Sequence, residues 1–220
     1  MNDNKIAFII CSNDDLLLSE ALNYLQLLNV PEGIEMDLLV IKDAKSMLLG
    51  MEEGIHSTDA KYKVFMHQDV LILNRDLISD IIEIFNSDSQ IGLIGMVGSP
   101  QMPPDAVMWN NERVGNCYGF RKYSSKFETL DQMFTEVDAV DGLLMATAYD
   151  IPLRTELFDG WDFYDVSTSF EYKRRGYRVV VPVQKEPWCL HDDGIVLSMW
   201  NYDKYRHFAM EEYPDYIPRL

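Results

Sequence analysis

Short apolar runs alternate with helical patterns along the first 96 residues, and this alternation constrains the fold more than any other feature. The runs have the length and composition of buried strands and cover residues 5–11, 35–41, 62–66 and 91–96. Between them, apolar residues recur every three or four positions, which predicts helices. Strands that alternate with helices pack as a mostly parallel sheet with helices on both faces. The sequence therefore predicts an α/β fold.

The pattern changes after Gly98. Prolines, glycines and the Asn110-Asn111 turn signal predict an irregular insertion at about 99–133, with a short hairpin at 109–118. The elements expected after it are a strand within 134–147 that Asp138 and Asp141 interrupt, a helix over 166–175, strands at 178–183 and 188–191, and a helical tail at about 198–220. Nothing in the sequence resembles a linker, so we expect a single domain over 1–220.

The chain has 220 residues and a formal net charge of −17. This charge disfavours non-specific binding to nucleic acids or anionic lipids, which depends on lysine and arginine. No apolar run reaches eighteen residues and the N-terminus lacks a signal-peptide pattern, so we expect no membrane span and a cytoplasmic location.

Three widely spaced cysteines, Cys11, Cys117 and Cys189, fit a reduced protein better than a disulfide scaffold.

Polar clusters follow several of the predicted strands. They are Ser12-Asn13 after the first strand, Asp43 after the second, His67-Gln68-Asp69 after the third, and Asp141-Gly142 within the interrupted strand. The carboxyl ends of parallel strands open onto one crevice, so these clusters should converge there. A single cluster of this kind can also be an ordinary solvated loop. A phosphate-bearing ligand of so acidic a protein needs a local cation, which carboxylate-bound Mg²⁺ or Mn²⁺ can supply.

Several segments in order resemble those of a known family. They are Ala7-Phe8-Ile9-Ile10-Cys11-Ser12-Asn13, Phe65-Met66-His67-Gln68-Asp69-Val70, Val140-Asp141-Gly142 and Gly160-Trp161-Asp162-Phe163-Tyr164-Asp165. Together they resemble family 2-like glycosyltransferases with the GT-A fold, and most closely a compact bacterial subgroup with an HQDV-type segment. The resemblance implies a Rossmann-like, mixed and mostly parallel central sheet flanked by helices. It covers most of residues 5–195 and is weak over 100–133.

The resemblance also implies roles for individual residues. Asp69 matches the last aspartate of the family's metal-binding DXD motif, whose first position is His67 here, and His191 resembles a late metal-binding histidine. Asp165 matches the aspartate of the Glu-Asp motif that acts as general base, and Tyr164 replaces the glutamate. The residues assigned to the nucleotide-sugar donor are Ser12, Asn13, Asp43, Gln68 and Asp141.

Each of these residues also has a plainer interpretation. Asp69 could cap a turn, His67 could orient its loop or bond a backbone carbonyl, and Asp165 could be the N-cap of the following helix. Further plain interpretations are that Asp141 satisfies nearby backbone groups, that His191 is structural, and that Trp161 packs in the core rather than stacking on a sugar.

The leading hypothesis is a glycosyltransferase that uses Mn²⁺ or Mg²⁺ and moves a sugar, with inversion, from a UDP-sugar to a hydroxyl. The acceptor would be a glycan, a lipid-linked molecule or a protein. The alternative is a non-catalytic protein of the same fold that binds a nucleotide or glycan, which the departures at His67 and Tyr164 motivate. A nucleotidyltransferase ranks lower, because the chain lacks a glycine-rich basic loop after the first strand to hold a triphosphate.

Overall fold

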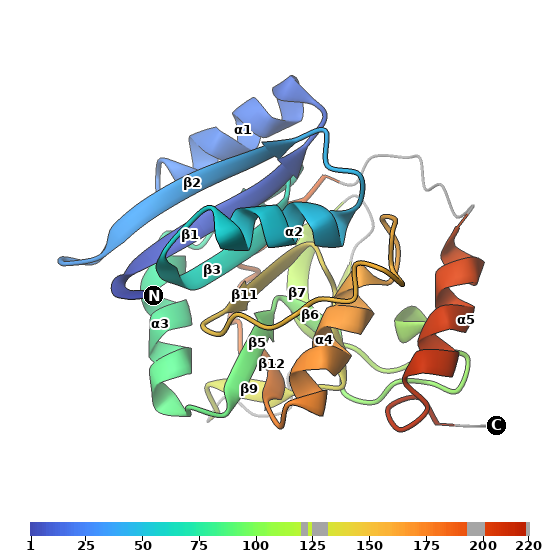
Figure 1. Ribbon diagram of the computed structural model, residues 1–220. Coiled ribbons are helices and arrows are strands. Elements are labelled where there is room, and N and C mark those ends of the chain that lie inside the picture. The colour runs from blue at the N-terminus through green and yellow to red at the C-terminus, as the bar shows by residue number, and fades with distance from the viewer. Residues whose placement is uncertain (120–122, 125–131, 193–200, 219–220) are drawn as a thin grey trace.

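A seven-stranded sheet forms the centre of the protein, in the order β2-β1-β3-β11-β5-β12-β9 (Figure 1). The computed structural model describes residues 1–119, 123–124, 132–192 and 201–218. The strands of the sheet are β1 (Asn2–Ser12), β2 (Glu35–Lys42), β3 (Ala60–His67), β5 (Ile91–Gly95), β9 (Phe134–Glu136), β11 (Leu144–Thr147) and β12 (Arg178–Pro182). β1 pairs in parallel with β2 and β3, and β12 with β5, whereas β11 runs antiparallel between β3 and β5. The expected mixed sheet is confirmed.

Helices cover both faces of this sheet. One face carries α1 (Asp15–Leu25) and α3 (Leu77–Ser87), and the other carries α2 (Met47–His56), α4 (Tyr164–Arg174) and α5 (Tyr202–Glu212). Strand β1 shows why both faces are apolar. Ile6, Phe8 and Ile10 pack with α1 and α3, whereas the alternate residues Ile9 and Cys11 pack with α2 and α4, as the two-residue period of a strand requires.

A second sheet, β10-β6-β7-β13-β4, lies beside the carboxyl ends of the central strands. Its strands are β4 (Val70–Ile72), β6 (Val97–Ser99), β7 (Val114–Gly119), β10 (Ala139–Val140) and β13 (Cys189–His191), and β8 (Tyr123–Ser124) pairs with β7. Strand β4 follows β3 after only Gln68 and Asp69, and β6 follows β5 after only Met96. The chain therefore passes between the sheets at the predicted cluster His67-Gln68-Asp69, and it does so again at Asp141-Gly142, between β10 and β11.

The predicted elements are mostly present, with two differences. Residues 108–110 form a short 3-10 helix and β7 pairs with β6, so the expected hairpin at 109–118 is wrong. The strand expected within 134–147 is divided into β9, β10 and β11, with breaks at Asp138 and at Asp141. Parts of the expected insertion (120–122 and 125–131) and the start of the expected tail (198–200) lie outside the described residues.

The three cysteines are free and buried. Cys117 on β7 and Cys189 on β13 lie on neighbouring strands, with their sulfur atoms 3.7 Å apart. None of the helices that the structure describes has the length and apolar character needed to cross a lipid bilayer.

Lys63 is an unusual residue for the middle of a central strand. Its side chain is fully buried, and its ammonium group contacts Asp150 Oδ1 at 2.7 Å and the Ala60 carbonyl at 2.6 Å.

Asp150→Ala should lower the free energy of unfolding by about 1–3 kcal/mol, because it leaves a buried cation without its carboxylate. Lys63→Met should cost less, because it removes the charge as well. Urea denaturation of both variants checks this, and a larger loss for Lys63→Met would contradict it.

Candidate functional site

Three potential metal ligands meet where the two sheets join. His67 ends β3, Asp69 lies in the turn that follows, and His191 ends β13. β13 pairs with β4 in a register that places His191 opposite Val70, the neighbour of Asp69. Sheet pairing therefore brings together residues that are 124 positions apart in the chain.

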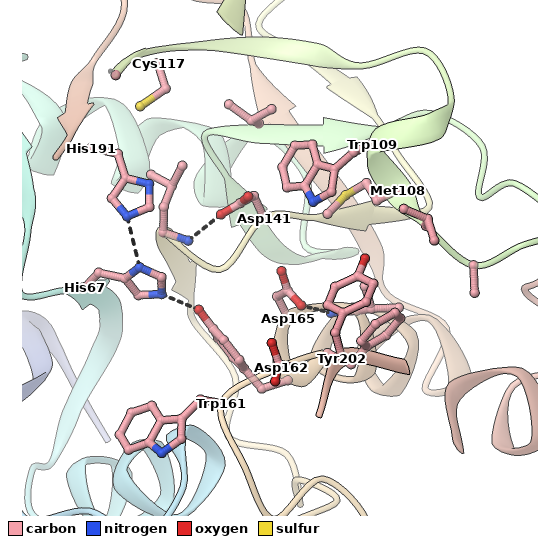
Figure 2. A pocket seen from close by; sticks show the side chains of 18 of the residues that line it. His67, Met108, Trp109, Cys117, Asp141, Trp161, Asp162, Asp165, His191 and Tyr202 are labelled. Atoms are coloured by element: carbon pink, nitrogen blue, oxygen red, sulfur yellow. Dashed lines mark hydrogen bonds between the residues drawn. The ribbon is translucent and has the colours of Figure 1, made fainter. Parts of the chain in front are cut away.

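The three side chains point toward one another. His67 Nδ1 lies 3.3 Å from His191 Nε2, and Asp69 Oδ1 lies 3.4 Å from His191 Nε2 and 3.9 Å from His67 Nδ1. Figure 2 shows the facing ring nitrogens of His67 and His191. Neighbouring ligands of an octahedral ion with bonds of about 2.1 Å are about 3 Å apart, so one ion can bridge this triangle after small side-chain adjustments.

Asp69 Oδ1 is the observation that points most directly to a cation. This oxygen is buried and has no hydrogen-bond partner among the described residues. A buried carboxylate oxygen without a partner is costly, and a bound cation is one of the few things that relieves that cost. The interpretation of Asp69 as a simple turn cap does not account for this oxygen. Two imidazoles and a carboxylate suit Mn²⁺ better than Mg²⁺, which prefers oxygen ligands.

The electrostatics of the cluster favour a neutral His67 and an ionised Asp69, the forms that bind a metal, but favour a proton on His191. Burial, reinforced by the nearby His191, lowers the pKa of His67, so its imidazole is neutral at physiological pH. Burial opposes ionisation of Asp69, but its contacts with His191 outweigh this effect and hold its pKa below the usual value. The pKa of His191 is raised by Asp69 against the effect of burial. A metal ion bound to His191 would therefore have to displace the proton that the Asp69 charge favours on that ring.

One cavity beside the cluster, of about 610 Å³, contains most of the residues assigned to the donor. Ser12, Asn13, Asp43 and Gln68 line it together with His67 and Asp69. Asp43 is exposed and has a left-handed backbone conformation, with φ of 57°, at the point where β2 leads toward α2. This conformation is uncommon for a residue with a side chain and is often found at binding sites.

Gln68 joins the two loops that form this cavity. Its side-chain oxygen accepts hydrogen bonds from the backbone N–H groups of Asn13 and Asp14, at 3.0 and 2.9 Å. Its amide group donates to Asn13 Oδ1 at 2.7 Å. Gln68 thereby holds the loop after β1 against the turn that carries Asp69, and its part in the cavity is to keep that loop in place.

A second cavity, of about 450 Å³, lies on the other side of His67 and Tyr164. Asp141, Asp162 and Asp165 line it, and Figure 2 shows Trp109, Trp161 and Tyr202 around them. Trp161 is 50% exposed and lines both cavities, so the interpretation of Trp161 as a core residue is wrong. Aromatic faces beside carboxylates are a common arrangement for binding sugar rings, which have apolar faces and polar edges.

Asp165 lies in the first turn of α4 and faces this second cavity. Its Oδ2 accepts from Gly142 N at 3.1 Å and its Oδ1 from Val166 N at 2.8 Å, and each oxygen retains a second lone pair. Burial, with a contribution from the charge of Asp141, raises the pKa of Asp165 to about 7. The N-cap of α4 is Phe163, so the interpretation of Asp165 as the N-cap is wrong.

The structure divides the predicted residues between these two cavities. Asp141 lies with Asp165 and not with Ser12 and Asp43, although it had been grouped with the donor residues. It also accepts a hydrogen bond from Leu143 N at 2.8 Å, so it satisfies the local backbone as the plainer interpretation held. Within the described part of the chain the His67 ring bonds no backbone carbonyl; its Nε2 contacts the Tyr164 hydroxyl instead.

Sequence reasoning missed several residues of the second cavity. Tyr202 lies in the predicted helical tail, which had no assigned role in a site, and it lines the cavity with Asp165. The predicted irregular insertion at about 99–133, where the family resemblance is weak, supplies Trp109, Met108 and Cys117. No spacing or motif in the sequence marks these residues.

Comparison with known proteins agrees with this arrangement. The sequence profile of a family described as "Glycosyltransferase like family" matches residues 7–213. No match was found among curated proteins.

Solved structures show the same fold at low sequence identity. TarS from S. aureus in complex with UDP superposes with a TM-score of 0.57 and 10% identity, over 86% of this chain and 60% of that one. The mannosyltransferase PcManGT from Pyrobaculum calidifontis, in complex with GDP-Man and Mn²⁺, gives a TM-score of 0.54 and 13% identity, over 88% of this chain and 58% of that one. This chain corresponds to 36% of the larger TarS structure. The fold is thus that of GT-A glycosyltransferases.

Proposed function

This chain belongs to the glycosyltransferase-like family, and on that premise we propose that it transfers a sugar from a nucleotide-sugar donor to a hydroxyl acceptor. We propose further that the donor is a UDP-sugar, that the reaction needs a divalent cation and that it inverts the sugar configuration. The observation that carries the proposal is the buried, unpartnered Asp69 Oδ1 facing His67 and His191 between two cavities.

The cavity lined by Ser12, Asn13 and Asp43 is the proposed nucleotide site. Its described lining residues include no lysine or arginine, so the diphosphate finds no cation in that lining. His67, Asp69 and His191 would hold Mn²⁺ at its edge. A bound divalent ion supplies charge neutralisation for the diphosphate, both in the donor and in the leaving group. The complex of PcManGT with GDP-Man and Mn²⁺ supports this assignment by analogy of fold.

The cavity lined by Asp165, Trp161 and Tyr202 is the proposed acceptor site. Asp165 takes the proton of the acceptor hydroxyl, the acceptor oxygen bonds to the anomeric carbon, and the bond from that carbon to the diphosphate oxygen breaks. A carboxylate with a pKa of about 7 is well suited to this, because a large fraction is ionised near neutral pH and this form is basic enough to accept a proton. Attack from the side opposite the leaving group inverts the anomeric centre.

A screen of nucleoside diphosphates and nucleotide sugars, with and without Mn²⁺, tests the proposal. UDP or a UDP-sugar should raise the melting temperature only when Mn²⁺ is present, and the donor should be slowly hydrolysed or transferred. Absence of binding to every nucleotide under both conditions would contradict the proposal. NMR of the transferred sugar gives its anomeric configuration, and a retained configuration would exclude inversion.

A non-catalytic nucleotide- or glycan-binding protein is the second candidate. The phenol of Tyr164 stands where the family pattern has a glutamate, and this departure favours the second candidate. Metal-dependent binding without any donor hydrolysis or transfer would support it over the enzyme.

Asp43→Ala should weaken UDP binding about 10-fold, because a hydrogen bond between a carboxylate and a base N–H contributes about 1.5 kcal/mol or more. Asp15→Asn is the matched control, because it removes the same charge from a residue that pairs with Lys42 and does not line the cavity. Calorimetric titration with UDP and Mn²⁺ measures both variants. Equal affinities of Asp43→Ala and the wild type would show that the base is held elsewhere.

A further inference from the structure

Tyr164 is the first residue of α4, and its phenol reaches the potential metal ligands from the opposite side of His67. The phenol oxygen contacts His67 Nε2 in a short hydrogen bond, whereas Nδ1 of the same ring faces Asp69 and His191. The two nitrogens of one imidazole thus have separate partners. The ring of Tyr164 is 5% exposed, so water competes little for this contact.

We propose that Tyr164 is a positioning residue of the metal site, whose oxygen accepts the Nε2 proton of His67 and thereby turns the Nδ1 lone pair toward Asp69 and His191. This inference rests on the metal site of the proposed function and adds a residue that does not itself touch the ion.

The argument follows from the single proton of a neutral imidazole. A ligand nitrogen needs a free lone pair, so when Nδ1 binds an ion the proton must be on Nε2. That buried N–H then needs an acceptor, and the Tyr164 oxygen is the one in contact with it. Without the phenol oxygen, the proton is better placed on Nδ1, where it can bond Asp69 or His191. That arrangement excludes the ion, so a Tyr164 oxygen that accepts from Nε2 favours the metal-bound state.

Gly142 is a second observation that fits this role. A Cβ atom at residue 142 would overlap the phenol ring and hydroxyl of Tyr164. The absence of a side chain there lets the ring lie against the backbone next to Asp141 and reach His67. Gly142 has no positive φ, so the requirement is for space and not for a special backbone conformation.

The test is the affinity of Mn²⁺, measured by electron paramagnetic resonance of the free ion, both with Mn²⁺ alone and with saturating UDP. Tyr164→Phe should weaken Mn²⁺ binding by about 10-fold or more, the size expected when a hydrogen-bond partner of a metal ligand is lost. Tyr172→Phe is the matched control, because Tyr172 is a buried tyrosine of the same helix whose hydroxyl bonds Thr147, away from the site. Its Mn²⁺ affinity should equal that of the wild type.

A double-mutant cycle separates positioning from a general structural effect. In the His67→Asp background, Tyr164→Phe should change Mn²⁺ affinity by less than about 3-fold, since the imidazole on which it acts is gone. A similar loss in both backgrounds would overturn the inference, as would a Tyr164→Phe variant with wild-type affinity. If the wild type binds no Mn²⁺ under either condition, both the inference and the metal proposal fail. If the wild type binds and Tyr164→Phe binds equally well, only the inference fails.

Discussion

Asp165→Asn is expected to reduce sugar transfer by about 100-fold to 10,000-fold while leaving donor binding intact, the range typical for loss of a general base. The variant keeps the size of the side chain but cannot take the acceptor proton. Asp165 lines the second cavity and not the nucleotide cavity, so UDP affinity in the presence of Mn²⁺ should be unchanged. Initial transfer rates and calorimetric binding of UDP measure the two quantities.

Asp162→Asn is the matched control for this prediction. Asp162 lines the same cavity, and burial raises its pKa as well, but it lies three residues before Asp165, outside α4, and is not the proposed base. We expect a higher KM for the acceptor with little change in kcat. Similar kcat values for Asp165→Asn and the wild type would remove Asp165 as the base.

The pH dependence of transfer follows from the same residue. Burial and the charge of Asp141 raise the pKa of Asp165 to about 7, so the basic form predominates above this pH. The rate should therefore rise about tenfold per pH unit below pH 7 and level off above it. Asp141→Asn removes the repelling charge, so the midpoint should move to lower pH. An unchanged midpoint would show that Asp165 does not set the pH profile.

Asp69→Ala is expected to remove the effect of Mn²⁺ on UDP binding. The substitution deletes the buried oxygen that accepts no hydrogen bond from the described residues and leaves only the two imidazoles of the cluster. Because the described lining of the nucleotide cavity has no lysine or arginine, the loss of the ion should weaken UDP binding at least about 100-fold, or about 2.7 kcal/mol.

Gln68→Ala provides the comparison for Asp69→Ala. Gln68 is adjacent in the chain and lines the same cavity, but it holds the loop of Asn13 and is not a candidate ligand. It should weaken UDP binding moderately and retain the dependence on Mn²⁺. If Asp69→Ala keeps the wild-type dependence on Mn²⁺, the ion lies elsewhere.

The residues that are close in sequence to strand ends were predictable from the sequence. Asn13, Asp43 and Asp69 each follow a short apolar run, and the geometry of an α/β sheet directs the ends of such runs to one edge. The direction of β11 was not predictable in this way, because an apolar run has the same pattern whether its strand is parallel or antiparallel. The roles of Asp165 and His191 were suggested only by the family resemblance.

Side-chain contacts between elements that are distant in the chain could not be predicted from the sequence. Tyr164 and His67 are 97 positions apart, and their contact depends on the rotamers of both residues and on the space that Gly142 leaves. Tyr202 has the helical spacing of a packing residue, and it does pack against Phe163, yet its position at the start of α5 also places it on the cavity wall. Periodicity reports which face of an element is buried, not which cavity that face borders.

The central claim is that one divalent cation binds between His67, Asp69 and His191. Anomalous X-ray scattering from crystals grown with Mn²⁺ and UDP tests it most directly. We predict one strong manganese peak bonded to His67 Nδ1, Asp69 Oδ1 and His191 Nε2, with the UDP diphosphate beside it and the uracil near Asp43. A manganese peak away from these three atoms, or bound UDP with no manganese peak between them, would contradict the account.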